Sequence, residues 1–377
     1  MNHVALIIPG LDRIGGAERQ VMLLAKGLHR RGWKVSVVAL SGTGSNAAAE
    51  LAQAGVAFLS LRMRRGLADP RGWLRFHRWL KREQPDVVHA HLAHAAWMAR
   101  WSRLATPRRV VVDTLHSSST GTHGRRLGYR VSDWLADEVT AVSHAVAGTH
   151  LGAGMAANIN VIPNGIDADE WRPDAAVREA VRCEHAIRDE FVWLAAGRLE
   201  PVKDYPTLLA ALALLPQSPQ LVIGGGGPLQ EQLRKQSSEL GIAGRVRFLG
   251  FEPDVRRWMR AADGFVLSSL WEGLPMALLE AAACGLPAVA TGVAGTREAV
   301  VHGETGWLAR QGDPKALAEA MTILMRTKEN DRIAMGERAR QRVMDCFSLE
   351  SALNRWEALY SDLLQRNRKP GRWARTP

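Results

Sequence analysis

Residues 263–308 read DGFVLSSLWEGLPMALLEAAACGLPAVATGVAGTREAVVHGETGWL. The apolar, partly β-branched run Gly264–Leu270 is short enough for a buried parallel strand. A helix is expected over Met276–Cys284, and Leu286–Thr291 follows as the next strand. This strand–loop–helix–strand order predicts an α/β fold with a parallel sheet.

This loop–helix unit carries two carboxylates. Pro275 is expected at the first helical position and Gly285 as the left-handed stop, with a flexible loop over residues 292–295 after the second strand. Glu272 then lies in the loop, and Glu280 lies inside the helix and leans back toward its start. That start offers free backbone N–H groups and the positive dipole end, which favour an anion. Carboxylates that accept sugar hydroxyls beside a phosphate site suggest a nucleotide sugar.

The spacing of Glu272 and Glu280, inside WEGLPMALLEAAACGLP, resembles the E-x7-E signature of retaining glycosyltransferases of family 4, which have the GT-B fold. The resemblance implies two Rossmann-like doubly wound α/β domains facing across a cleft. It implies that Glu280 binds the donor ribose and Glu272 a hydroxyl of the donor sugar. The helix start beside them, which is Gly273, Leu274 and Pro275, is also expected to bind the substrate. The alternative is a solvated Glu272 and a Glu280 on the helix surface.

Length, cysteine content and charge restrict the classes to which the protein can belong. The chain has 377 residues, enough for two domains, and three scattered cysteines, which favour a reducing cytoplasm. The start lacks the basic, apolar pattern of a signal peptide, and no apolar run approaches a membrane span. Residues 1–165 carry 21 lysines and arginines against 10 acidic residues, whereas the remainder carries 28 of each. The whole net charge of +11 therefore lies on the first half, which suggests an anionic partner there.

The first half begins with a strand, His3–Pro9, a glycine-rich loop and a helix over Ala17–Arg31. In this arrangement the amides of Gly15 and Gly16 can approach a phosphate, and a plain tight turn is the alternative. In family 4 a similar G-G-x-E loop faces the donor diphosphate, so the resemblance implies substrate binding by Gly15 and Gly16. Further strands alternate with helical segments and are expected at Lys34–Leu40, Val56–Leu61, Asp86–His91, Arg109–His116 and Glu138–Ser143.

The segment Pro70–Glu83 is expected to be a helix in which arginines alternate with aromatic residues. This composition is typical of a helix at a membrane interface. The alternative is a crossover helix whose apolar stripe packs on the sheet, and both interpretations hold if the arginines point outward. The cations of this region are Arg62, Arg64, Arg65, Arg71, Arg75, Arg78, Lys81 and Arg82, and the tryptophans are Trp73 and Trp79.

The histidines of the first half suggest two kinds of site. His89, His91 and His94 have metal-like spacing, but no carboxylate or cysteine joins them, and DVVHxH is common in the resembled family. His116 ends the strand VVVDTLH, and strand ends line the ligand crevice of open α/β sheets. The resemblance places the matching histidine beside the donor sugar and makes His116 a catalytic candidate, with a merely buried histidine as the alternative.

The second half carries two cations five residues apart, Arg198 and Lys203, on a loop between a strand at Phe191–Gly197 and a helix at Tyr205–Leu215. Such a pair can flank a diphosphate. The sequence AGRLEPVKD resembles the family's G-R-L-x-x-x-K-G, whose cations bind the leaving diphosphate, although Asp204 replaces the usual glycine.

Two further strands of this half are expected near the nucleotide. Gln220–Gly227 is a strand ending in four glycines, including Gly226, where a nucleotide could approach closely before a helix at Pro228. Arg245–Phe251 is another strand, whose end is expected at the base.

The expected domains are residues 1–166 on the acceptor side, 167–347 for the nucleotide sugar, a helix at 348–365 that crosses back to the first domain, and a disordered basic tail at 366–377. Asp167 and Asp169 form a D-x-D pattern just after the Asn164-Gly165 turn and are interpreted as structural.

Together these features predict a retaining glycosyltransferase, on the inner face of the cell membrane, with a nucleotide-sugar donor (UDP favoured) and a lipid-linked or polysaccharide acceptor. The resemblance requires no metal and no cofactor. A nucleotide-sugar epimerase of the same fold is the alternative enzyme. A basic nucleic-acid-binding protein is the non-enzymatic alternative, but the sequence contains no recognition motif for one.

Overall fold

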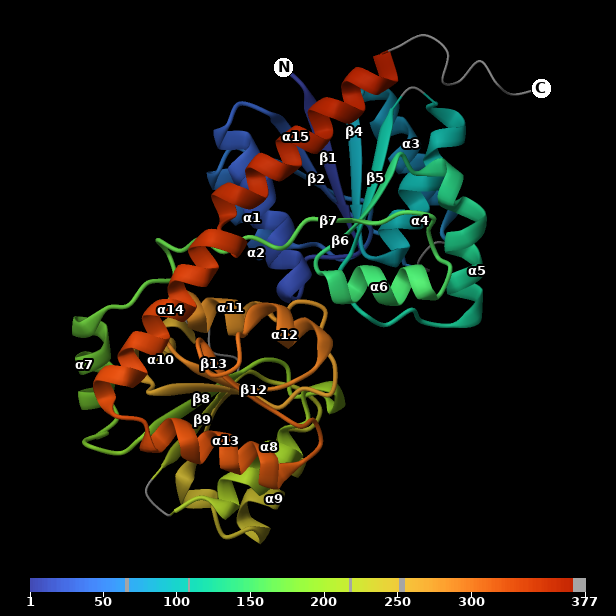
Figure 1. Cartoon of the computed structure of the whole chain (residues 1–377). Coiled ribbons are helices and arrows are strands. Elements are labelled where there is room, and N and C mark those ends of the chain that lie inside the picture. The colour runs from blue at the N-terminus through green and yellow to red at the C-terminus, as the bar shows by residue number, and fades with distance from the viewer. Residues whose placement is uncertain (65–67, 108, 217–218, 251–254, 369–377) are drawn as a thin grey trace. The chain divides into compact units, whose positions relative to one another are not determined.

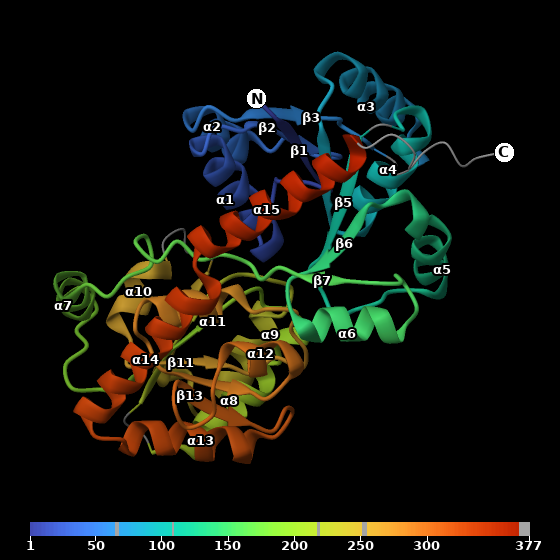
Figure 2. The same cartoon turned by 45° about the horizontal axis from the view of Figure 1, so that its top comes forward.

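The computed structural model describes residues 1–64, 68–107, 109–216, 219–250 and 255–368. The chain divides into two compact units. Unit 1 contains Met1–Gly165 together with the segment that begins at Leu349, and unit 2 is Ile166–Ser348. Figures 1 and 2 show that each unit is a sheet covered by helices on both faces. The sequence-based prediction of two doubly wound α/β domains is confirmed.

Unit 1 contains, in its described part, a seven-stranded parallel sheet in the order β3-β2-β1-β4-β5-β6-β7. Its strands are β1 (His3–Ile8), β2 (Lys34–Ala39), β3 (Ala57–Ser60), β4 (Val87–His91), β5 (Val110–Leu115), β6 (Glu138–Ala141) and β7 (Asn160–Val161). The central strands β1, β4 and β5 are buried throughout, as expected for parallel strands that helices cover on both faces, although β4 and β5 also contain polar residues.

The helices of unit 1 form two layers. They are α1 (Gly16–Arg30), α2 (Ser45–Gln53), α3 (Pro70–Glu83), α4 (Ala93–Ser102), α5 (His123–Ser132), α6 (His144–Gly152) and α15 (Leu349–Arg368). Helices α1, α2 and α15 cover one face of the sheet, and α3, α4 and α5 cover the other (Figures 1 and 2). The change of face follows from right-handed crossovers, because the chain reverses its direction across the sheet between β3 and β4.

Helix α15 packs against α1 although the two helices are more than 300 residues apart in the sequence. Leu353, Trp356 and Tyr360 join the apolar core formed by α1 and β1. The helix continues to Arg368, so the tail predicted at 366–377 is wrong for residues 366–368, which are helical. Arg366 and Asp362, one turn apart, form an ion pair within this last stretch. Residues 369–377 lie outside the described part of the chain.

Unit 2 contains, in its described part, a six-stranded parallel sheet in the order β10-β9-β8-β11-β12-β13. Its strands are β8 (Val192–Ala196), β9 (Gln220–Gly224), β10 (Val246–Gly250), β11 (Gly264–Leu267), β12 (Ala288–Thr291) and β13 (Gly306–Ala309). The helices are α7 (Ala175–Glu184), α8 (Tyr205–Leu214), α9 (Gln230–Glu239), α10 (Val255–Ala261), α11 (Met276–Ala283), α12 (Ala294–Ala299), α13 (Pro314–Arg326) and α14 (Glu329–Phe347). Figure 1 shows α8, α9 and α13 on one face and α10, α11 and α14 on the other.

Two predicted helix starts and one predicted loop differ from the structure. Pro275 has an extended ψ of 104° and is the N-cap of α11, not its first residue. The predicted flexible loop at 292–295 is wrong because α12 begins at Ala294, where the Thr296 hydroxyl caps the Thr291 and Val293 carbonyls. Helix α9 begins at Gln230 rather than at Pro228, after a turn closed by the Gln230 amide and the Gly227 carbonyl. The left-handed stop at Gly285 is confirmed by its φ of 71°.

Within the described residues, no helix is both long and apolar enough to cross a membrane.

Candidate functional site

The β8–α8 loop carries the two predicted cations. Arg198 is 69% exposed and pairs with Glu200 at 2.9 Å. Lys203 ends a short 3-10 turn, and its neighbour Asp204 has a φ of 47°. That left-handed conformation explains why glycine suits this position in the resembled family, and aspartate tolerates it better than most residues. Asp204 therefore preserves the turn, and both cations remain at the end of β8.

Lys203 meets Glu272, which comes from the next loop of the sheet. Lys203 Nζ lies 2.5 Å from Glu272 Oε1, and the same oxygen accepts a hydrogen bond from Ser269 Oγ at 2.6 Å. The two side chains are only 20% and 11% exposed, so the pair is shielded from water. The sequence predicted separate roles for these residues and did not predict their contact.

The two loops are also joined through their main chains. The Leu270 amide donates to the Val202 carbonyl at 2.9 Å, and Ser268 Oγ donates to the Lys203 carbonyl at 2.8 Å. Because β8 and β11 are neighbouring parallel strands, their carboxyl ends meet at one edge of the sheet. Ser268 and Ser269 are thus further candidate site residues, and the sequence did not indicate them because serines in an apolar strand carry no specific signal.

The turn before α11 and Glu280 within this helix are both buried. Gly273, Leu274 and Pro275 are buried. A Cβ atom on Gly295 would lie 2.4 Å from the Gly273 carbonyl oxygen, so α12 packs directly against this turn. Glu280 is buried on α11, so the alternative of a carboxylate on the helix surface is wrong.

The glycines after β9 allow close packing of two loops. A Cβ atom on Gly225 would lie 2.0 Å from the Gly197 carbonyl oxygen, and one on Gly227 would lie 2.5 Å from that of Leu199. The Leu199 amide donates to the Gly226 carbonyl at 3.1 Å. These glycines are therefore needed for packing, which the sequence did not indicate. Without side chains, they allow the Arg198 loop to lie directly against the β9–α9 loop.

Unit 1 carries the remaining predicted site residues at the carboxyl edge of its own sheet. Gly15 precedes α1 and Gly16 is its first residue, and the Gly15 amide donates to Glu18 Oε2 at 3.0 Å. This contact is half of a capping box and orders the glycine loop. His116 follows β5 directly and is half-buried. The structure thus brings Gly15, Gly16 and His116 to strand ends of one sheet.

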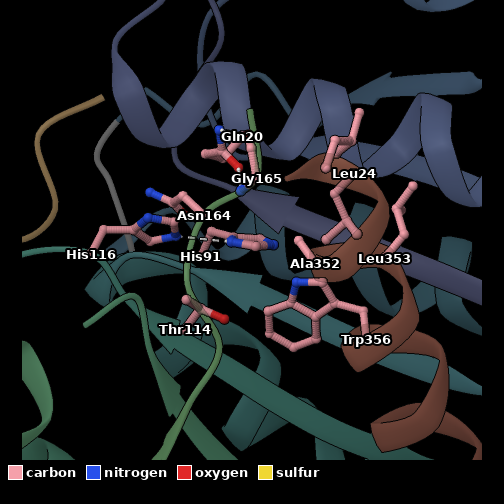
Figure 3. Close-up of a pocket in the computed structure, with 11 residues that line it drawn as sticks. Gln20, Leu24, His91, Thr114, His116, Asn164, Gly165, Ala352, Leu353 and Trp356 are labelled. Carbon is pink, nitrogen blue, oxygen red and sulfur yellow. Dashed lines mark hydrogen bonds between the residues drawn. The ribbon is translucent and has the colours of Figure 1, made fainter. Parts of the chain in front are cut away.

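His116 lies in a pocket of unit 1 (Figure 3). Its Nε2 is 3.0 Å from Nδ1 of His91, for which the sequence suggested only a possible role as a metal ligand. The other lining residues come from α1, β5, the end of unit 1 and α15, and they are Gln20, Leu24, Thr114, Asn164, Gly165, Leu349, Ala352, Leu353 and Trp356. The pocket therefore combines polar groups at the strand ends with an apolar wall from the C-terminal helix.

His89 anchors the floor of this region through two short hydrogen bonds. Its Nδ1 is 2.6 Å from the Tyr360 hydroxyl, and its Nε2 is 2.7 Å from the Thr114 hydroxyl. Burial lowers the pKa of His89 and of His91 well below the usual 6.5, and it lowers the pKa of His116 to about 4. Since burial disfavours the charged imidazole, all three rings are neutral near pH 7.

Gln20 of α1 binds Gly165, the last residue of the first segment of unit 1. Its side-chain amide donates to the Gly165 carbonyl at 2.8 Å and accepts from the Gly165 amide at 2.9 Å. A Cβ atom on Gly165 would lie 2.7 Å from Leu349 Cα, so the chain leaving unit 1 touches the chain entering α15. A side chain at residue 165 would not fit into this close contact, which explains the glycine there.

The D-x-D pattern caps a turn. Asp167 Oδ1 accepts from the amides of Asp169 and Glu170, both at 3.2 Å. This agrees with the structural interpretation of the pattern. Across the described residues, no group of three or more histidine, cysteine or acidic side chains is placed to hold a metal ion.

Helix α3 has the predicted bounds and two distinct faces. Phe76 and Trp79 are buried with their rings stacked at 6.3 Å, so the proposed surface role of Trp79 is wrong. Arg62 and Arg64, before the helix, are exposed, and Arg65 lies outside the described residues. The exposed cations of the helix are Arg71, Arg75, Arg78, Lys81 and Arg82. The apolar stripe packs on the sheet while the cations point to solvent.

Two doubly wound parallel α/β units, with two cations and Glu272 on strand-end loops of the second and Glu280 in the helix that follows, define a glycosyltransferase of the GT-B fold. Residues 177–342 match the family described as "Glycosyl transferases group 1", and residues 14–170 match "Glycosyltransferase Family 4". The chain belongs to glycosyltransferase family 4, and its relatives act on nucleotide sugars.

Similar proteins include a "UDP-Gal:alpha-D-GlcNAc-diphosphoundecaprenol alpha-1,3-galactosyltransferase" of Escherichia coli, 25% identical over 79% of this chain and 81% of its own. The "N-acetyl-alpha-D-glucosaminyl L-malate synthase" of Bacillus anthracis is 30% identical over 76% of this chain and 77% of its own. Among solved structures, Anabaena Alr3699/HepE in complex with UDP has a TM-score of 0.84 at 24% identity, covering 96% of this chain and all of the other. This last likeness shows the fold.

Proposed function

We propose that this chain is a retaining, metal-independent hexosyltransferase that moves a sugar from a UDP-sugar to a lipid-linked or polysaccharide acceptor. The observation that carries the proposal is the Lys203–Glu272 pair. It joins a cation expected at the donor diphosphate to a carboxylate expected at the donor sugar. The two groups lie on loops at the ends of adjacent strands, where ligands of open α/β sheets bind.

The chemical step breaks the bond between the sugar and the diphosphate, so negative charge grows on the leaving group. Groups that bind this growing charge more tightly than the starting diphosphate accelerate the step. Arg198, Lys203, the start of α11 and the amides of Gly15 and Gly16 have that task in the proposal. They take the place of a divalent metal. Retention then follows from attack on the face that the diphosphate leaves.

The ion pair suggests how the donor engages the loop. In the structure, Glu272 neutralises Lys203, so the donor diphosphate must compete for Lys203 Nζ. Displacement frees Glu272 Oε1 to accept a hydrogen bond from a sugar hydroxyl. Glu272 thus acts on the sugar only when a diphosphate holds Lys203, and Glu280, buried in α11, binds the ribose.

The donor and acceptor classes are supported by the relatives. The Escherichia coli relative is named for UDP-galactose and for a lipid diphosphate acceptor, which suits a role in cell-surface glycan synthesis. The Bacillus anthracis relative is named for L-malate, a small soluble acceptor, and this is the alternative to be tested. Neither relative is an epimerase, and no contact described above favours one.

We propose that unit 1 associates with the anionic inner face of the cell membrane. Its α3–α4–α5 layer exposes the α3 cations and also several large apolar side chains. These are Leu74, Trp101, Leu104, Leu127, Val131 and Trp134, which are 43% to 62% exposed. Cations beside exposed tryptophan and leucine are typical of a membrane interface, and each cation near an anionic bilayer contributes about 1 kcal/mol. Trp101 and Trp134 therefore replace Trp79 as the proposed aromatic anchors.

The test is incubation of the full chain with UDP-linked and GDP-linked sugars, with and without a membrane lipid extract. Mass spectrometry should detect a glycosylated lipid only with a UDP-sugar and only when lipid is added, and NMR should show the same anomeric configuration in donor and product. Conversion of one UDP-sugar into another without any acceptor would instead identify an epimerase. Transfer to L-malate alone would contradict the lipid or polysaccharide acceptor.

A further inference from the structure

His91 uses only one of its two ring nitrogens for a hydrogen bond. The residue is 2% exposed, and its Nδ1 is 3.0 Å from His116 Nε2. Its Nε2 is buried and has no hydrogen-bond partner among the described residues. Figure 3 shows the two imidazoles side by side, with Trp356 and Leu353 of α15 closing the pocket beyond His91.

Only one proton occupies the contact between these two neutral rings. If His116 donated it, His91 would accept at Nδ1 and would carry its own proton on Nε2. That arrangement would bury an N–H group without an acceptor, which folded proteins avoid more strictly than an unpaired acceptor. If His91 donates from Nδ1, its buried Nε2 holds only a lone pair. The unpaired nitrogen therefore favours His91 as the donor.

The neighbours of His91 hold its ring in place. His89 lies next to it with ring centroids 4.1 Å apart, and both His89 nitrogens are occupied by Tyr360 and Thr114. Thr114 is in turn 2.7 Å from the Thr140 hydroxyl. His89 therefore cannot offer a hydrogen bond to His116 in place of His91.

We propose that His91 is a positioning residue that sets the tautomer of His116. By donating from Nδ1 to His116 Nε2, it keeps the His116 proton on Nδ1, the side of the ring turned away from His91. His116 then presents a fixed N–H donor to an oxygen of the donor sugar. Among the described residues, His116 has no other hydrogen bond that would compete for this proton. The inference rests on the proposed function for the identity of the ligand.

This arrangement defines what His116 does in the reaction. Its Nε2 lone pair is occupied by the His91 proton, so His116 does not serve as a base through that atom. It acts as a neutral hydrogen-bond donor, whose partner oxygen becomes more favourably bound as the sugar changes shape in the transition state. His116 touches the substrate, and His91 acts only through His116.

The first test needs no substrate. The full chain is labelled with 15N-histidine, the His116 signals are assigned by their loss in His116→Asn, and nitrogen shifts report which ring atom carries the proton. We expect Nδ1 of His116 to be protonated in the wild type. His91→Leu cannot donate and should remove the fixed tautomer, whereas the amide of His91→Asn can donate and should restore it. A His116 proton on Nε2 in the wild type would overturn the proposal.

The second test measures turnover of a UDP-sugar by the same variants. We expect His91→Leu to lower kcat/KM roughly tenfold, as for loss of one hydrogen bond, with unchanged affinity for bare UDP and with recovery in His91→Asn. His94→Leu is the matched control, because His94 is exposed on α4, and it should change neither turnover nor the His116 signals.

The readouts separate this proposal from the proposed function. If no variant turns over a UDP-sugar, the proposed function is contradicted. The NMR measurement still tests the His116 tautomer independently. If His91→Leu does not fold, the wild-type spectrum and His91→Asn decide the question. Equal turnover by wild type and a folded His91→Leu whose His116 tautomer has changed would contradict the positioning role.

Discussion

Unit 1 and unit 2 distribute charge in opposite ways. Unit 1 has 27 lysines and arginines against 13 acidic residues, and unit 2 has 22 against 25. Yet the cations proposed to meet the donor's phosphates, Arg198 and Lys203, belong to the nearly neutral unit 2. The pocket of the strongly basic unit 1 contains no charged side chain among its lining residues: its polar groups are neutral imidazoles, a hydroxyl and amides, and the rest of its wall is apolar. Net charge therefore does not mark the proposed catalytic site of this protein.

The reason lies in where each unit puts its charges. In unit 1 the helix α3 exposes its cations and packs its aromatic rings inside, so the charge acts on the outer surface. In unit 2 the strand-end loops hold Lys203 against Glu272, where both side chains are shielded from water, and Arg198 lies on the same loop as Lys203 and pairs with Glu200. A charge that is held in place and partly shielded from water acts more strongly on a ligand than many solvated ones.

The sharpest way to break this comparison is to remove the cations of unit 2. Arg198→Ala or Lys203→Ala should lower turnover by roughly two to three orders of magnitude, as for loss of one donor to a developing anion. Steady-state kinetics with the UDP-sugar measures the effect. Lys235→Ala, an exposed cation on α9, is the control and should leave turnover unchanged. Near-normal turnover in both loop variants would rule out their role at the diphosphate.

The surface charge of unit 1 is tested with vesicles. The chain should co-sediment with anionic but not with neutral vesicles, and binding should weaken as salt rises. Reversing Arg71, Arg75 and Arg78 to Glu should weaken this partitioning by about two orders of magnitude or more, given about 1 kcal/mol for each lost cation.

The matched control for this reversal lies in unit 2. Exposed Lys235, Arg326 and Lys328 changed to Glu alter the net charge equally and should bind vesicles as the wild type does. Equal losses in both triple variants would show that only total charge matters. Equal binding to anionic and neutral vesicles would contradict the proposed membrane association.

A third test sharpens the comparison inside unit 2. Glu280→Gln should weaken binding of bare UDP by roughly tenfold, since a charged hydrogen bond to the ribose is lost. Glu272→Gln should leave UDP affinity unchanged or raise it, because Lys203 loses its internal partner, while turnover falls. Calorimetry with UDP separates the two variants. Wild-type UDP affinity in Glu280→Gln would refute the ribose role.

The neutral histidines of unit 1 predict a dependence of stability on pH. Burial lowers the pKa of His116 to about 4, whereas a histidine in the unfolded chain titrates near 6.5. Between these values the unfolded chain binds more protons, so the free energy of unfolding falls as pH falls. The contribution of His116 is about 1.4 kcal/mol for each pH unit below 6.5, and it levels off below pH 4.

Urea unfolding at pH 7 and pH 5 measures this loss. His116→Asn should lose less stability over that interval than the wild type, while His94→Asn, which removes an exposed histidine, should behave as the wild type. An identical loss in all three proteins would mean that His116 is protonated as readily in the fold as in the unfolded chain.

Removing or adding a divalent metal is expected to have no effect on turnover. If the cations of unit 2 replace a metal, EDTA should leave turnover unchanged, and adding Mg²⁺ or Mn²⁺ should not raise it. Loss of activity in EDTA with recovery on adding Mg²⁺ would overturn metal independence and the structural interpretation of Asp167 and Asp169.

Much of the architecture could be predicted from the sequence because its signals are local. The strand beginning at Gly264, the left-handed stop at Gly285 and the whole of α3 follow from apolar periodicity, glycine and proline within a few residues. The family resemblance rests equally on short segments, so Arg198, Lys203, Glu272 and Glu280 could all be selected from the amino-acid sequence alone. The errors at Pro275 and Ala294 concern single helix turns, where local propensity is weakest.

The sequence by itself thus determined the two α/β domains, the family and the candidate site residues. Only the tertiary structure decided which of them touch. Lys203 meets Glu272 across 69 residues and His89 meets Tyr360 across 271, and no local pattern encodes these distances along the chain. The burial that keeps His91 and His116 neutral likewise arises only when the strands, the segment at Asn164 and Gly165, and α15 pack together. The reason is that loss of hydration is a property of the assembled fold.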